Sequence, residues 1–336
     1  MVEISNGKIN LLIDNSEILD NVSGIGFGTN IFKKCNALNL TIKNKNADRE
    51  RIEEAIRIIK KNTSLFSNFR GNNLITTSVN VSQEPDMEGA LEDIMVIYKE
   101  LKEVFFSNEY LILAAQIIYS ARERIKISEA IINTRAAYDY MKKSHRFLTG
   151  YEDICSAAVI ATTSNNLEKT FEDVEECYTT LSKLGFSKGN YLQGLCNMLA
   201  VINLPVKEKC EKAYKMRKSL KEKGVNLKGH AFPILGVIPF VCDDYDDFGE
   251  EASIVSEKIR NAKGFGNFSL GSHLRNMIAV SLVASEHSEY LGEKLKENIK
   301  NLTNNASLSI VIAMQVAAAS AAAASAAAAS SASSGS

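Results

Sequence analysis

The sequence predicts an all-α protein built from tandem helical hairpins of about 40 residues, on the strength of three observations. Short turns recur along the chain at spacings of 40, 40, 40, 39 and 40 residues. The segment before each turn is amphipathic with the 3.6-residue period of an α-helix, and the segment after it is apolar on almost every side. Only four prolines occur in 336 residues, and proline is the residue that most disrupts long helices.

The turns coincide with residues that end helices. They begin at Leu65, Phe105, His145, Gly185, Gly224 and Gly264. Lysines gather just before most of them, where a positive charge complements the negative end of the helix dipole. Glycine opens three of the turns and takes the left-handed backbone conformation of a helix C-cap at little cost. The spacing therefore has a physical cause and defines six repeat units.

The two helices of each unit differ in how they are buried. Before the fourth turn, Phe171, Val174, Tyr178 and Leu181 fall on one stripe, as on a surface helix. The segments after the turns, such as 111–118, 154–161 and 195–202, are nearly all apolar and predict buried helices. This alternation predicts an α-solenoid, in which each unit covers the apolar face of the next, with a closed α/α toroid as the alternative.

Some parts of the chain depart from the regular unit. Pro233 and Pro239 predict a short or kinked helix in the fifth unit. Residues 1–48 are expected to form an irregular N-terminal cap with a strand-like segment at 9–13, followed by the helical-repeat domain at 49–303. Residues 304–336 are rich in Ala and Ser and predict a frayed helix or a disordered tail.

Composition narrows the class of function and the compartment. Lys+Arg is 39 and Asp+Glu is 40, which argues against a nucleic-acid-binding protein. Six cysteines occur without a C-x-x-C motif, and the N-terminus lacks the features of a secretory signal. We therefore expect a protein of the reducing cytoplasm. A membrane-spanning helix needs about twenty strongly apolar residues, and the tail offers fewer, so membrane contact through the tail is only an alternative.

Several short stretches resemble a known family. They are Ile59-Lys60-Lys61-Asn62, Phe69-Arg70-Gly71, His145-Arg146-Phe147-Leu148-Thr149-Gly150, Lys188-Gly189-Asn190 and Gly264-Phe265-Gly266-Asn267-Phe268-Ser269-Leu270. With them, residues 51–287 resemble the bacterial domain-of-unknown-function 4003 family, and the Ala- and Ser-rich end also looks like that family. The family has no assigned activity. The resemblance therefore implies the architecture and a bacterial cytoplasmic origin, and it transfers no catalytic residue.

Motifs that would carry chemistry are incomplete. The glycine cluster at 24–28 lacks the third glycine of a nucleotide-binding loop and predicts a flexible turn. The acidic segment 243–251 lacks two ligands of a calcium loop and predicts a helix start, where carboxylates face the positive end of the dipole. The four histidines do not fall in a zinc-binding pattern. We therefore predict no catalytic residue, no cofactor and no metal site.

One row of residues suggests a binding surface. Tyr110, Tyr151, Tyr191 and His230 stand 41, 40 and 39 residues apart, each in the loop that opens a buried helix. Equivalent loops of a repeat array line up along one edge, where aromatic residues can bind a protein or peptide. The alternative is local packing of each ring over its helix start. The sequence thus favours a non-catalytic scaffold for a protein or peptide partner. The alternative function is an enzyme on an α/α toroid that acts on an unknown small molecule or peptide.

Overall fold

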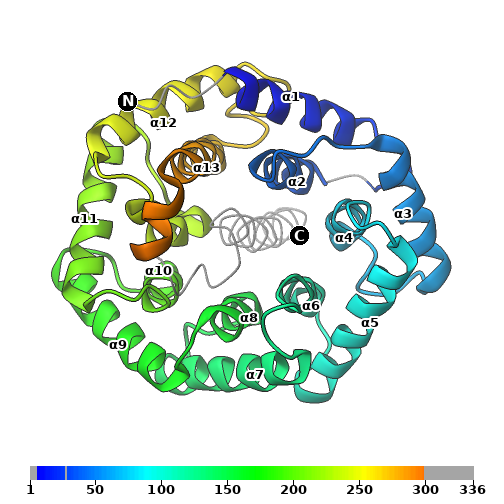
Figure 1. The fold of residues 1–336 in the computed structure, drawn as a ribbon, viewed down its shortest axis with the longest axis horizontal. Coiled ribbons are helices and arrows are strands. Elements are labelled where there is room, and N and C mark those ends of the chain that lie inside the picture. The colour runs from blue at the N-terminus through cyan, green and yellow to red at the C-terminus, as the bar shows by residue number, and fades with distance from the viewer. Residues whose placement is uncertain (1–5, 27–28, 299–336) are drawn as a thin grey trace, which may run out of the picture.

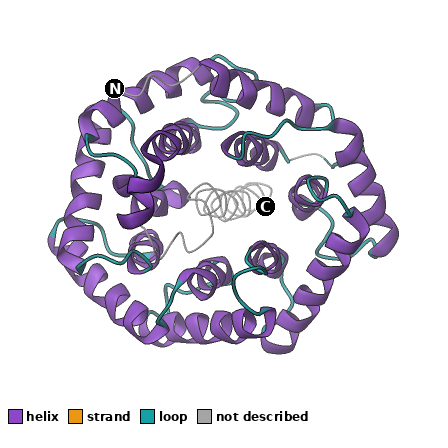
Figure 2. Cartoon of the chain, in the orientation of Figure 1, coloured by secondary structure: helices purple, strands orange, loops and turns teal. Residues whose placement is uncertain are grey.

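The computed structural model of the protein describes the backbone of residues 6–26 and 29–298, with side chains up to residue 288. This part of the chain contains α-helices and two short 3-10 helices and no β-strand, so the predicted all-α class is confirmed. The helices form two concentric rings (Figure 1), and the connections that the structure describes are loops and turns (Figure 2). The tail expected at 304–336 lies outside the described residues.

Outer and inner helices alternate along the chain. The outer helices are α1 (Asn6–Asp20), α3 (Arg49–Asn62), α5 (Met87–Val104), α7 (Ile127–Ser144), α9 (Leu167–Lys183), α11 (Val206–Glu222) and α12 (Tyr245–Arg260). The inner elements are α2 (Asn30–Ile42), α4 (Asn72–Val81), α6 (Tyr110–Ser120), α8 (Asp153–Thr163), α10 (Asn190–Ala200), the 3-10 helices η1 (Gly229–Gly236) and η2 (Ile238–Phe240), and α13 (Ser272–Asn298).

Burial follows the pattern that the sequence predicts. On α9 the buried residues follow steps of one, three or four positions and form one stripe, whereas every residue of α6 from Tyr110 to Tyr119 is buried. Gly185 and Gly224 directly follow the ends of α9 and α11 and have φ values of 88° and 80°, the left-handed conformation expected there. The expectation for Gly264 was wrong, because α12 already ends at Arg260 and Gly264, with a φ of 87°, lies in the following loop. The proline-containing fifth unit has the two 3-10 helices in place of a regular inner helix, which confirms the prediction of a short helix there.

The expectation for the N-terminal residues was wrong. Residues 6–26 and 29–42 are not an irregular cap: they contain a further pair of helices, α1 and α2, and the segment 9–13 is helical instead of strand-like. The buried side of α1 carries Ile9, Leu12 and Leu19 at helical spacing, but it also carries Asn15 and Ser16. These two polar residues sit where apolar ones were expected, and they hide the helical period in the sequence.

The first and last hairpins contact each other. Lys8 Nζ on α1 donates to Ser285 Oγ on α13 over 2.9 Å, and Asn30 Nδ2 at the start of α2 donates to Ser269 Oγ over 2.7 Å. Lys34 Nζ on α2 lies 5.2 Å from the centre of the Phe265 ring. An open solenoid would leave its end hairpins apart. The described helices therefore have the arrangement of the alternative, a closed toroid (Figure 1).

Buried charges join neighbouring outer helices. Lys209 on α11 is fully buried, and its Nζ donates to Asp173 Oδ2 on α9 over 2.5 Å and to the carbonyl oxygen of Ile202 over 3.2 Å. Asp173 is itself 7% exposed and also lies 3.4 Å from Lys169 Nζ. An ion pair out of water is costly to break, because the remaining charge loses its partner and has little solvent.

We expect Lys209→Met to lower the free energy of unfolding by about 3 to 5 kcal/mol, since Asp173 would then lack its buried partner. Urea denaturation followed by circular dichroism measures this. Lys218→Met on the same helix is the control, because Lys218 and Glu222 form an exposed pair and should contribute less than about 1 kcal/mol. Equal decreases in the free energy of unfolding of the two variants would show that the buried Lys209–Asp173 pair stabilises the fold no more than the exposed pair does.

Candidate functional site

The loops that lead from an outer to an inner helix lie together at one end of the ring. Contacts between successive hairpins lie at this end: Asn68 to Ser107, Cys155 to the carbonyl of Tyr110, Gln193 to Thr149, Tyr191 to His230, Asn276 to the carbonyl of Asn226, and Asn30 to Ser269. We call this end, made of the described residues 21–26 and loops 63–71, 105–109, 145–152, 184–189, 223–228 and 261–271, the turn face.

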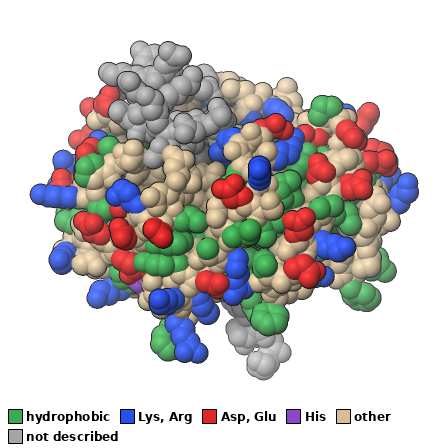
Figure 3. Space-filling model, turned by 60° about the horizontal axis from the view of Figure 1, so that its bottom comes forward, with side chains coloured by type: hydrophobic (Ala, Val, Ile, Leu, Met, Phe, Trp, Pro, Cys, Tyr) green, Lys and Arg blue, Asp and Glu red, His purple; other side chains and the backbone are tan. Residues whose placement is uncertain are grey.

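Large apolar side chains are exposed on the turn face. The Phe66, Phe106, Phe147 and Phe268 side chains are 98%, 82%, 97% and 108% exposed, and each lies on a different loop. In the part of the chain that the structure describes, the loops at the opposite end expose no large apolar side chain. Figure 3 shows single hydrophobic side chains standing out from the surface beside Lys and Arg. Some of these phenylalanines mark turns in the sequence, but their exposure was not predicted.

The structure separates the members of the predicted aromatic row. Tyr110 is only 9% exposed at the start of α6, where its backbone carbonyl accepts a hydrogen bond from Cys155 Sγ over 3.8 Å. Tyr151 and Tyr191 are 50% and 46% exposed. The Tyr191 ring meets the partly buried His230 ring edge-on at 5.3 Å between centroids. The structure thus brings Tyr191 and His230 together at the turn face, and it places Tyr110 in the core.

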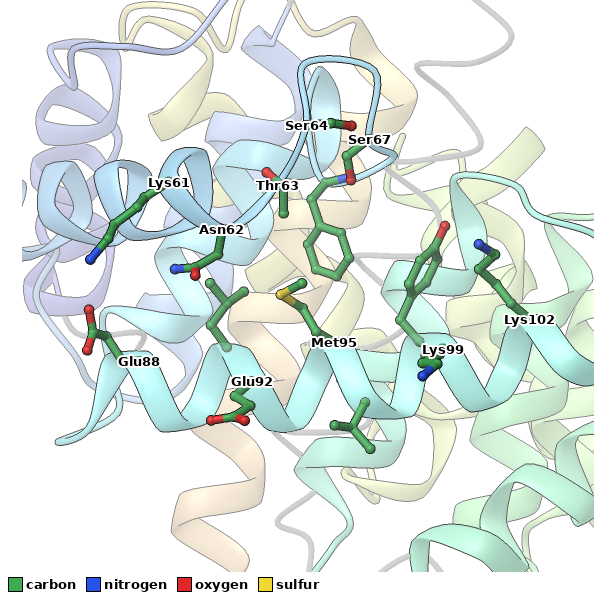
Figure 4. A pocket seen from close by; sticks show the side chains of 14 residues that line it. Lys61, Asn62, Thr63, Ser64, Ser67, Glu88, Glu92, Met95, Lys99 and Lys102 are labelled. Atoms are coloured by element: carbon green, nitrogen blue, oxygen red, sulfur yellow. The ribbon is translucent and has the colours of Figure 1, made fainter.

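A groove that sequence reasoning missed runs along the outer wall between α3 and α5 (Figure 4). It encloses about 760 Å³. One wall is the end of α3 and the following loop, from Lys61 to Phe69, and the other is a stripe of α5 from Glu88 to Lys102. The two walls come from different hairpins, so no local sequence pattern indicates the groove. We call it the α3–α5 groove.

The base of the groove is apolar and held in place by its neighbours. Phe69 packs edge-on against Tyr98, with ring centroids 5.3 Å apart. The Tyr98 hydroxyl accepts a hydrogen bond from Asn68 Nδ2 over 3.0 Å. Arg70 supports the loop by donating to the carbonyl oxygens of Lys60 and Thr63. Such fixed walls cost little ordering entropy when a ligand binds.

Charges are distributed unevenly along the groove. Glu88 and Glu92 lie toward the start of α5, and Lys99 and Lys102 lie toward its end. Figure 4 shows Lys61 on the opposite wall, pointing toward Glu88. The acidic end is therefore partly balanced by Lys61, whereas the Lys99–Lys102 end carries a positive charge that would attract an acidic group.

Other motifs singled out in the sequence have local structural roles. Asp244 caps α12 by accepting from the backbone N–H groups of Asp246 and Asp247, as expected of an acidic helix start. Gly24 has a φ of 82°, and its carbonyl accepts from Lys60 Nζ over 2.7 Å, so its part of the glycine cluster is a turn. Within residues 6–26 and 29–288 no three His, Cys, Asp or Glu side chains gather as metal ligands.

One carboxyl at the turn face has a shifted pKa. Asp153 begins α8 and accepts a hydrogen bond from the Gly150 backbone N–H over 2.9 Å. Burial raises the pKa of Asp153 to about 7. The negative charge of Glu152 acts in the same direction, while the Gly150 hydrogen bond and the charge of Lys142 oppose it. A carboxyl that titrates near neutrality exchanges protons at physiological pH.

The raised pKa of Asp153 makes stability depend on pH. The folded protein holds this proton up to about pH 7 while the unfolded chain releases it near pH 4, so stability should fall as pH rises through this window. Asp153→Asn keeps an oxygen for Gly150 and removes the titration. Urea unfolding between about pH 5 and pH 8 measures how the free energy of unfolding depends on pH. Its slope should be shallower in Asp153→Asn than in the wild type, by up to about 1.4 kcal/mol per pH unit. Parallel slopes would contradict the shift.

None of the described helices combines the length and the apolar character that crossing a bilayer requires.

Comparison with known proteins places the chain in a family. The uncharacterized protein YeaA of Bacillus subtilis (strain 168) is 25% identical over 258 residues, which make up 74% of this chain and 75% of that protein. No solved structure matches. The profile of a family described as protein of unknown function, DUF4003, matches residues 21–317. As the sequence resemblance predicts, the chain belongs to this DUF4003 family.

Proposed function

We propose that this protein is a non-catalytic docking protein of the cytoplasm that holds a protein or peptide partner. The observation that carries the proposal is the α3–α5 groove, which combines an apolar base, charged borders and firmly held walls. Peptide-binding sites combine these features, because apolar contacts supply affinity and charged borders supply orientation. The six cysteines are all buried free thiols, which supports the reducing cytoplasm as the compartment.

The dimensions of the groove suit a short peptide segment. Its α5 wall runs from Glu88 to Lys102, a length of about 21 Å at about 1.5 Å per helical residue. An extended chain rises about 3.3 Å per residue, so about six residues would fill it. The Met95 side chain points into the groove midway along this wall (Figure 4). We therefore propose a linear segment with apolar residues at its centre and an acidic residue facing Lys99 and Lys102.

The aromatic row without Tyr110 supplies a second proposed contact with the partner. Tyr151 lies on a turn-face loop, Tyr191 and His230 lie at the starts of the inner elements α10 and η1 beside that face, and all three are at least partly exposed. Partly exposed tyrosines are frequent at protein interfaces because the ring buries a large area and the hydroxyl stays hydrogen-bonded. Tyr110 is not included, because its buried ring supports the local-packing alternative.

An enzyme is the alternative function, and two observations favour it. The ring is closed, and Asp153 has a pKa of about 7, which suits a general acid or base at neutral pH. A screen of metabolites and peptides for turnover, with Asp153→Asn as the comparison, tests this alternative. We favour the docking function over an enzyme, because the hydrogen bond from Gly150 gives Asp153 a structural role without any catalytic one.

We expect random peptides selected from a display library on the immobilised protein to bind in the α3–α5 groove. Met95→Asp should weaken the binding of a selected peptide at least about tenfold, since it places a charge on the apolar base. Lys99→Glu/Lys102→Glu should change the selected sequences from acidic to basic at one end. Fluorescence anisotropy of labelled peptides measures the affinities.

Ile132→Asp is the matched control, because Ile132 is 67% exposed on α7, another outer helix, and lies outside the groove. Tyr151→Ala/Tyr191→Ala tests the second contact in the same assay. Selected peptides that bind Met95→Asp as tightly as the wild type would overturn the assignment to the groove. A loss of peptide in Tyr151→Ala/Tyr191→Ala alone would move the binding site to the turn face.

A further inference from the structure

The exposed phenylalanines of the turn face are not part of the proposed peptide groove. Phe66, Phe106, Phe147 and Phe268 are almost fully exposed at the tips of four loops on one end of the ring. We propose that the turn face docks the protein onto an anionic lipid bilayer. The four rings would enter the interfacial layer, and the surrounding Lys and Arg side chains would bind lipid headgroups.

The way in which the rings are exposed favours a bilayer over a protein partner. Residues that dominate protein interfaces cluster in a common patch, where neighbouring contacts exclude water. Exposed Leu65 adjoins Phe66, and half-exposed Tyr151 shares the loop of Phe147. The four rings nevertheless lie on four different loops, so a protein would need four separate pockets at matching positions. The interface of a bilayer accepts an aromatic ring at any position. The closed ring of hairpins places all four tips at one end, where a flat target can reach them together.

The charge of the same loops complements an anionic surface. The turn-face loops carry six basic residues, Arg70, Arg146, Lys188, Lys223, Lys228 and Lys263, against two acidic ones, Glu109 and Glu152. Each outer helix from α3 to α12 also has at least one basic residue in its last turn. The whole chain has a net charge of −1, so the turn-face loops have an excess of positive charge that the chain as a whole lacks.

Helix dipoles do not account for all of these cations. Lysines in the last turn of an outer helix stabilise the helix end, but Arg146, Lys188 and Lys228 lie beyond the helix ends within the loops. In the part of the chain that the structure describes, these three side chains form no ion pair with a carboxylate. Arg146 directly precedes Phe147, so a cation and an apolar ring stand side by side at one loop tip.

This combination predicts how binding should depend on lipid and salt. Basic residues near an anionic surface are attracted to it, and the attraction weakens as salt shortens the screening length. Inserted rings add an apolar contribution that salt does not remove. Binding should therefore require anionic lipid, decrease with salt and depend on the rings at every salt concentration.

Vesicle flotation tests the proposal with the full-length protein. The wild type should float with vesicles of equal parts phosphatidylcholine and phosphatidylglycerol and should not float with phosphatidylcholine alone. Phe66→Ser/Phe106→Ser/Phe147→Ser/Phe268→Ser should weaken binding by at least about a hundredfold. Arg146→Glu/Lys188→Glu/Lys228→Glu should weaken it by at least about tenfold and reduce its salt dependence. Circular dichroism checks that each variant folds.

Ile132→Ser/Ile254→Ser is the matched control, because both residues are exposed apolar side chains on outer helices. It should float like the wild type, and so should Met95→Asp, since Met95 lies within α5 and not on a turn-face loop. A wild type that stays unbound, or a four-ring variant that floats normally, would overturn the proposal. The proposal would also be overturned if the wild type did not bind vesicles and the four rings were instead required for binding a protein. None of these results bears on peptide binding in the groove.

Discussion

The burial of the inner helices on every side is the constraint on which the rest of the structure depends. A helix such as α6, buried from Tyr110 to Tyr119, needs an outer helix behind it and an inner neighbour on each flank. A linear array cannot satisfy this at its two ends. The ring satisfies it by packing α2 against α13, with Lys34 beside Phe265 and Asn30 bonded to Ser269 at the junction. Closure thus removes both open ends of the core.

Buried polar groups set the register between neighbouring inner helices. Asn39 on α2 donates to Asn80 Oδ1 on α4 over 3.3 Å, and Asn80 donates to Gln116 Oε1 on α6 over 2.6 Å. Sliding one helix along its neighbour would break these bonds and leave amides unpaired in a buried site, at a cost of about 1 to 3 kcal/mol each. Because the register is fixed, the helix starts stay level, and the turn face is a single surface.

Local physics made much of this fold predictable. The helix ends before Gly185 and Gly224 follow from a residue type that tolerates positive φ, and the Asp244 cap follows from a carboxylate at a helix start. The hairpin α1–α2 escaped prediction because Asn15 and Ser16 occupy buried positions. Closure of the ring could not be read from the sequence either, since it depends on contacts between residues as far apart as Lys8 and Ser285.

The candidate sites were less predictable than the fold, for the same reason. The α3–α5 groove brings Lys61 of one hairpin opposite Glu88 of the next, and no spacing within a segment indicates that they face each other. At the turns, Phe105 is buried and Phe106 is exposed. Two adjacent phenylalanines indicate a turn but do not tell which ring faces water. The regular spacing of Tyr110, Tyr151 and Tyr191 pointed to one surface, yet Tyr110 belongs to the core.

Contact between one end of the ring and an anionic bilayer can be measured directly, because the sequence contains no tryptophan. Phe147→Trp would place a single fluorophore at a turn-face tip, and Ile132→Trp would place one on the outer wall. We expect vesicles of phosphatidylcholine and phosphatidylglycerol to shift the emission of Phe147→Trp to the blue, brominated lipid to quench it, and Ile132→Trp to stay unchanged. Unchanged emission of Phe147→Trp, or equal responses of the two variants, would contradict the proposed contact.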